Sequence, residues 1–277
     1  MNSTGYTEPV SLLLTYGEAN WDEWDDYAPY GFTNEHVPQL IRLGTDRHLL
    51  VDDDVDEAAM WAPMHAWRVL AQMKAPEAIA PLVRVLALLD ESDSDLIGEG
   101  FQDVLESFGP AAIEPLAGFL VEAEDGNGGL VGAGEALSKI GTAHLEHRDR
   151  IVEILGTAFE ARYLSNDPMI NGFWIADLLD LHAVESYPVI KAAYEAKAVD
   201  PMISGDLEDV EIELGLREKR KTPRPLTPFQ RAMGLGLERG LSTPEPFPFI
   251  TTPKVEKKEK NKRKQENKSR KKNRKKR

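Results

Sequence analysis

The chain has 277 residues, of which 42% are apolar, and it carries a formal net charge of −14 at pH 7. This length and composition allow one substantial hydrophobic core. Because the chain contains no cysteine, disulfides, thiolate metal sites, iron–sulfur clusters and thiol nucleophiles are excluded. The apolar run Leu12-Leu13-Leu14 is far too short for a signal-peptide core or a membrane span. We therefore expect a cytoplasmic protein that does not contact a membrane.

Residues 1–57 are predicted to form an N-terminal cap. Trp21 and Trp24 place two large apolar rings among acidic residues. This pattern indicates that the aromatic side of the segment is buried against the rest of the chain. A patch that binds a partner would show the same pattern.

Residues 58–217 contain a repeated motif. The sequence AIAPL at residues 78–82 returns as AIEPL at residues 112–116, an offset of 34 residues, and Pro76 and Pro110 keep that offset. A third copy begins at Tyr187-Pro188. Self-similarity at this period is typical of stacked helical repeats. Apolar residues at steps of three and four precede each copy, so each unit is predicted to be a pair of helices.

Four helix pairs follow from this pattern, and no segment alternates at period two, so strands are not expected. Gly109-Pro110 and Gly141-Thr142 are predicted to separate the two helices of their pairs, because glycine tolerates a positive φ and proline or threonine suits a helix start. Pro81 and Pro115 are placed in the first turn of a second helix. The predicted pairs are 61–73 with 77–89, 96–108 with 111–123, 130–140 with 146–161, and 168–181 with 184–197.

The chain resembles bacterial HEAT-like repeat proteins, including the group named after the HEAT-like repeats of phycobilisome lyases. The resemblance covers about Gly31 to Leu216. It implies an all-α fold, a right-handed α-solenoid of HEAT-like helix pairs. Some relatives end in a cysteine-rich SEC-C metal knuckle, which this chain lacks. The residues that carry the resemblance are the segments 61–67 (WAPMHAW), 171–173 (NGF), 178–181 (LLDL) and 205–211 (GDLEDVE).

Residues 218–253 are predicted to be a proline-rich linker, because seven of the eighteen prolines fall between Thr222 and Pro253. Within it, Phe229, Met233 and Leu237 repeat every four residues, which permits a short helix over 228–240. That helix would either dock on the last repeat as a terminal cap or bind a groove on another protein.

Residues 254–277 form a tail with fifteen Lys or Arg and three Glu, a net charge of +12. The remaining residues therefore carry 18 basic and 44 acidic side chains, a net charge of −26. The tail has almost no apolar residues and is predicted to be disordered. It would neutralise phosphates without base stacking, solubilise the protein, or fold back on the acidic body. The tail residues expected to make contacts are Lys262, Arg263, Lys264, Lys268, Arg270, Lys271, Lys272, Arg274, Lys275, Lys276 and Arg277.

If a surface of the repeats binds a partner, polar residues on the second helices are expected to line it. The geometry of those helices selects Arg84, Glu114, Glu122, Glu153, Lys191 and Glu195.

Other motifs do not support a metal, cofactor or catalytic site. His144 and His147 lack a third ligand and are interpreted as surface or capping residues, and His65 as a hydrogen-bonded packing residue. Asp52, Asp54 and Asp56 begin like a calcium loop, but the glycine and glutamate that such a loop needs are missing. The glycine-rich residues 126–134 lack the Gly-Lys-Ser/Thr of a phosphate loop and are expected to allow close helix packing.

These observations favour a scaffold or adaptor that binds another macromolecule through the repeat surface, with the tail as an auxiliary contact. A second hypothesis is association with nucleic acid or the ribosome through the tail. A third, suggested by the naming of relatives, is a subunit that acts with a lyase or chaperone on a cofactor-bearing client.

Overall fold

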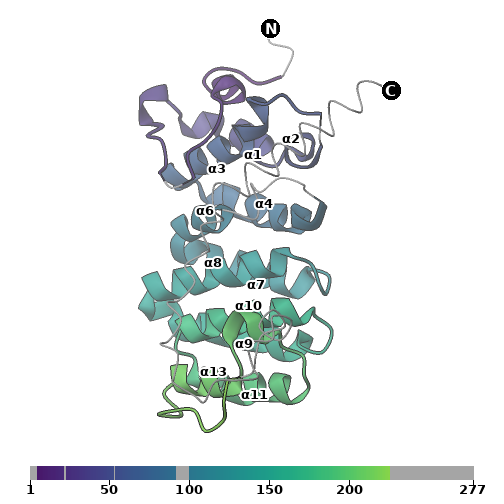
Figure 1. Cartoon of the computed structure of the whole chain (residues 1–277). Helices are drawn as coiled ribbons and strands as arrows, with labels where there is room; N and C mark the ends of the chain where they lie inside the picture. Colours follow the sequence, from purple (N-terminus) through teal and green to yellow (C-terminus); the bar gives the residue numbers. More distant parts are fainter. Residues whose placement is uncertain (1–4, 22, 53, 92–99, 225–277) are drawn as a thin grey trace, which may run out of the picture. The chain divides into compact units, whose positions relative to one another are not determined.

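The computed structural model describes residues 5–21, 23–52, 54–91 and 100–224. Those residues form α-helices and short 3-10 helices and include no strand, which confirms the predicted all-α class (Figure 1). The predicted helix 228–240 and the basic tail lie outside the described residues. Within them, no single helix has both the length and the apolar character needed to cross a membrane; one bent pair, Phe101–Ser107 with Gly109–Glu122, passes that test jointly by length and composition.

The helices are arranged in two rows, in which each helix contacts the next member of its row (Figure 1). The first row runs through α1 (Val37–Gly44), α3 (Ala62–Gln72), α6 (Phe101–Ser107), α8 (Gly129–Ala143), α10 (Pro168–Asp180) and α12 (Pro201–Ser204). The second row runs through α4 (Ile79–Val83), its 3-10 extension η6 (Arg84–Glu91), α7 (Ile113–Glu122), α9 (Arg148–Arg162) and α11 (Tyr187–Glu195). Two further helices are α2 (Arg47–Val51) and α13 (Leu207–Glu213).

Every second-row helix begins after a 3-10 turn, and α4, α7 and α11 begin at a copy of the sequence repeat. Pro81 and Pro115 lie in the first turns of α4 and α7, as predicted, where a missing N–H leaves no intrahelical hydrogen bond unmade. The turns are η5 (Pro76–Ala78), η7 (Gly109–Ala112), η8 (Leu145–His147) and η9 (Val184–Ser186).

Two glycines, Gly109 and Gly141, were predicted to separate the two helices of a pair. The prediction is confirmed for Gly109 and wrong for Gly141. Gly109 has a φ of +64° and lies between the end of α6 and α7, as the first residue of the 3-10 turn η7. Gly141, however, lies inside α8, which continues to Ala143. A β-carbon at Gly141 would come within 2.6 Å of Leu181, so this glycine serves close packing and not chain reversal.

Two buried tryptophans bind neighbouring helices of the first row. The indole nitrogen of Trp67 in α3 donates to the carbonyl oxygen of Gly44 in α1 at 2.6 Å, and that of Trp174 in α10 donates to Leu130 in α8 at 2.9 Å. Both indoles are fully buried, so these hydrogen bonds satisfy their only donors. Gly134 of α8 lies against Trp174, which confirms the close-packing role predicted for the glycine-rich segment.

Aromatic side chains of the N-terminal segment pack on α3 and on η4 (Ala59–Trp61), the 3-10 turn that precedes it. Trp21 stacks edgewise on Trp61, with ring centroids 5.6 Å apart. His65 of α3 is fully buried, with its Nε2 3.0 Å from the Gly17 carbonyl and its Nδ1 2.6 Å from the Tyr27 hydroxyl. Because a carbonyl can only accept, Nε2 carries the proton and Tyr27 donates to Nδ1. Burial lowers the pKa of His65 and favours this neutral form, which confirms the predicted packing histidine.

The described chain ends in a basic segment, residues 217–224, which we call the arginine strap. Arg217 pairs with Glu208 and Glu211 of α13, and Arg220 pairs with Asp206, which caps that helix, and with Asp209. The Glu208 carboxylate also accepts hydrogen bonds from the backbone of residues 221 and 222. The first residues of the predicted linker are therefore fixed to α13.

Candidate functional site

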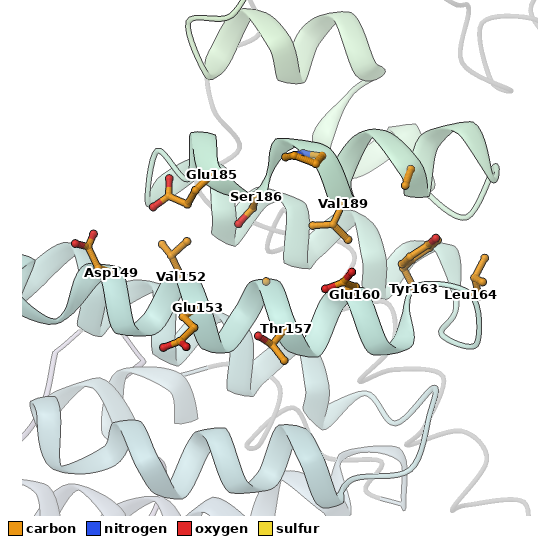
Figure 2. A pocket seen from close by; sticks show the side chains of 13 residues that line it. Asp149, Val152, Glu153, Thr157, Glu160, Tyr163, Leu164, Glu185, Ser186 and Val189 are labelled. Atoms are coloured by element: carbon orange, nitrogen blue, oxygen red, sulfur yellow. The ribbon is translucent and has the colours of Figure 1, made fainter.

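A groove of about 700 Å³ lies between α9 and α11 in the second row (Figure 2). Asp149 and Glu185 lie at one end of the groove, and Tyr163 and Leu164 lie at the other. The groove is lined by Asp149, Val152, Glu153, Gly156, Thr157, Glu160, Tyr163, Leu164, Glu185, Ser186, Pro188, Val189 and Ala192.

Helix periodicity explains why α9 presents its lining side chains to the groove. Residues 149, 152, 153, 156, 160 and 163 follow one another at steps of one, three or four and share one face of the helix. Ile151 and Leu155, which point away from this face, are fully buried in the core. Gly156 removes a side chain where α9 faces Ser186, since a β-carbon there would lie 3.3 Å from the serine oxygen.

The groove is acidic. Four of its lining residues are carboxylates, and none is lysine or arginine. Arg148 lies beside it and donates hydrogen bonds to Glu185 and Asp149, and the bond to Glu185 lowers the pKa of that carboxyl. Glu160 makes no ion pair with any described residue. The groove therefore presents negative charge to its surroundings.

Two arginines at the ends of α9 hold it to its neighbours. Arg148 donates to the carbonyl oxygens of Leu181 and His182 at the end of α10. Arg162 donates to the carbonyl oxygens of Val121 and Ala123 at the end of α7. These contacts satisfy carbonyl groups that a helix end leaves without partners, and they fix the wall of the groove.

Glu153 is the one predicted surface residue that lines the groove. Glu114 lies outside it on α7 and pairs with Arg150 of α9. Lys191 pairs with Glu195 on the exposed side of α11. Arg84 and Glu122 are exposed on η6 and α7, away from the groove, and the predicted tail contacts lie outside the described residues.

The sequence pattern does not single out Asp149, Glu160 and Glu185 as members of the site. Asp149 and Glu160 are four residues before and seven residues after Glu153, on the same face of a helix that the sequence did predict. That spacing is a usable signal for both. Glu185 comes from the turn before α11, so its position depends on how the two helix pairs stack.

The histidines of the described residues do not assemble into a site with the groove. His144 caps the end of α8, as interpreted from the sequence. Three potential metal ligands, His48, Asp52 and Asp54, come within 4.8 Å of one another, but all are exposed. The imidazole of His48 already binds the Asp52 carboxylate at 2.7 Å, which raises the pKa of His48. This group is explained as a local surface ion pair.

Residues 32–224 match the model of a family described as "Protein of unknown function (DUF1186)". The match spans both helix rows and the arginine strap. No curated protein and no solved structure is significantly similar to the chain.

Proposed function

Because the chain belongs to the family described as "Protein of unknown function (DUF1186)", we propose a function from the groove itself: a non-catalytic scaffold or adaptor that binds another protein between α9 and α11. The observation that carries this proposal is the open acidic groove of about 700 Å³ on the second row of helices. Concave surfaces with a few convergent polar groups are common binding sites.

We also propose that the two rows form a HEAT-like, right-handed α-solenoid. Three features support it: the order of contacts within each row, the recurrence of a 3-10 turn before each second helix, and the sequence offset of 34 residues. In such folds each pair covers the apolar face of its neighbour, and the stacked helices present a continuous surface to partners. The groove lies on that surface.

The test fills the groove with a bulky side chain. Thr157 is exposed on α9 and lines the groove, so Thr157→Trp should occupy its volume without disturbing the core. Ala80→Trp adds the same side chain to an exposed position of α4, away from the groove, and is the matched control. Proteins captured from native lysate by the wild type should be lost with Thr157→Trp and retained with Ala80→Trp, as measured by quantitative mass spectrometry. Equal capture by all three proteins would exclude the groove as the binding site.

A further inference from the structure

We propose that the groove between α9 and α11 takes a segment of a partner protein in which lysine or arginine residues alternate with apolar residues. This inference rests on the proposed function and adds the chemistry of the partner. It is carried by the balance of charges at the groove, by the spacing of its carboxylates and by its apolar surfaces.

The charges at the groove do not balance. Arg148 is shared by Asp149 and Glu185. Arg150, two residues further along α9, is shared by Glu114 and Glu153. Glu114 lies outside the groove. The four carboxylates that line it, Glu160 included, share two guanidinium groups, so two negative charges remain uncompensated among the lining residues. A cationic partner would gain attraction here, and a phosphate-bearing partner would be repelled.

The spacing of the carboxylates sets the length of the segment. Asp149 and Glu160 are eleven residues apart on one helix, which corresponds to about 16 Å at 1.5 Å per residue. An extended chain covers that distance with about five residues, at roughly 3.3 Å each. In an extended segment, neighbouring side chains point in opposite directions. If every second residue points its cationic group toward the carboxylates of the groove, the residues between them point toward the apolar lining residues.

The apolar side chains of the groove suit those intervening residues. Val189 of α11 faces the groove and is partly exposed, whereas Val152 of α9 lines the groove but is only 3% exposed (Figure 2). Leu164 lies at one end of the groove with 75% of its surface exposed, beside Tyr163. Covering such side chains with apolar groups of a partner is favourable at about 25 cal/mol per Å². A purely charged ligand would leave this surface in water, so the observations favour a protein segment over nucleic acid.

The experiment measures binding of a fluorescein-labelled peptide, Lys-Leu-Lys-Leu-Lys-Leu, to the full chain by fluorescence anisotropy. Two matched probes replace every Lys by Glu or every Leu by Ser. We expect the Lys–Leu peptide to bind most tightly and its affinity to fall as salt rises. The double variant Glu153→Gln with Glu160→Gln should weaken binding about tenfold. The control, Glu77→Gln with Glu122→Gln, removes the same charge from exposed positions of η5 and α7 outside the groove and should bind as the wild type does.

Circular dichroism of each variant establishes that the fold is intact. Equal losses in the two double variants would overturn the inference, because attraction would then depend on net charge alone. Equal binding of the Lys–Leu and Lys–Ser peptides would overturn its apolar component. If no cationic peptide binds while Thr157→Trp still abolishes partner capture, the groove functions as proposed and the assigned chemistry of the partner is wrong.

Discussion

At the scale of single residues, Asp177 of α10 is a buried carboxyl group that lacks full hydrogen bonding. Its Oδ2 atom has no hydrogen-bond partner and lies against Gly134, where a β-carbon would come within 2.6 Å of it. Burial raises the pKa of Asp177 well above its ordinary value, and the nearby carboxylates of Glu135 and Asp180 act in the same direction. The folded chain therefore keeps a proton that the unfolded chain releases above its pKa of 3.8.

The sign of this difference makes Asp177 a destabilising residue at neutral pH. As pH rises from 5 to 7, its contribution to the free energy of unfolding falls, because the unfolded state binds fewer protons. Asp177→Asn removes the titration, and we expect it to raise the free energy of unfolding at pH 7 by on the order of 1 kcal/mol. Urea unfolding at pH 5 and pH 7 measures both effects. Glu122→Gln, at an exposed position, is the control; an unchanged pH dependence in Asp177→Asn would contradict the assignment.

At the scale of elements, the arginine strap holds α13 through side chains that are shielded from water. The Arg220 guanidinium is 19% exposed and binds the Asp206 and Asp209 carboxylates, both about 20% exposed. Burial opposes the ionised form of Asp209, yet hydrogen bonds from Arg224 and Arg220 keep its pKa below the ordinary value. Partly buried, bidentate ion pairs of this kind contribute more to the stability of the fold than ion pairs on the surface do.

Removing Arg220 should release the strap and loosen α13 without unfolding the rest of the chain. Hydrogen bonds to charged groups contribute about 1.5–3 kcal/mol each, so amides of Leu207–Glu213 should exchange at least about tenfold faster in Arg220→Ala. Hydrogen exchange with mass spectrometry compares this helix with α8, whose exchange should not change. Lys219→Ala, an exposed neighbour in the strap, should leave α13 as in the wild type. The same acceleration in both variants would show that the strap acts through its overall charge and not through the Arg220 pairs.

The sequence predicted the helices better than it predicted their ends and their surfaces. Periodic apolar residues placed α3 and α10 within a residue of their observed bounds, because helix burial leaves a direct pattern in the sequence. The end of α8 was harder to predict: Gly141 suggested a stop, but the helix continues to Ala143. A glycine that ends a helix and a glycine that allows close packing look alike in the sequence, and only the contact of Gly141 with Leu181 separates the two roles. In the groove, Glu153 could be predicted from the periodicity of α9 alone, whereas the position of Glu185 depends on how α9 and α11 pack against each other.

At the scale of the whole molecule, the acidic body and the basic tail are expected to bind partners of opposite charge. The body surface described here carries the acidic groove, and the 24 residues of the tail carry a net +12. We propose that phosphate-bearing partners, if bound, are bound by the tail and not by the groove. Each neutralised phosphate releases condensed counterions, so such binding weakens steeply with salt.

This division gives a prediction for nucleic acid. If the tail engages about six phosphates of a duplex, the log–log slope of affinity against salt should be near −5 for the full chain. The chain truncated after residue 253 should show no measurable binding, whereas Thr157→Trp should bind nucleic acid as the wild type does. Filter binding or anisotropy with a labelled duplex at several salt concentrations measures the slope. A flat response, or binding that survives truncation, would exclude the tail as the nucleic-acid contact.

The contacts within each helix row also bear on how the chain folds. Because each helix packs mainly on the next helix of its own row, and α7, α8, α9 and α10 also contact one another in chain order, the contacts between helices join elements that are near neighbours along the chain. Low contact order of this kind favours rapid folding. The N-terminal helices can therefore pack while later residues are still emerging from the ribosome, and none of the helices between residues 5 and 224 that the structure describes has to wait for the far end of the chain to be synthesised.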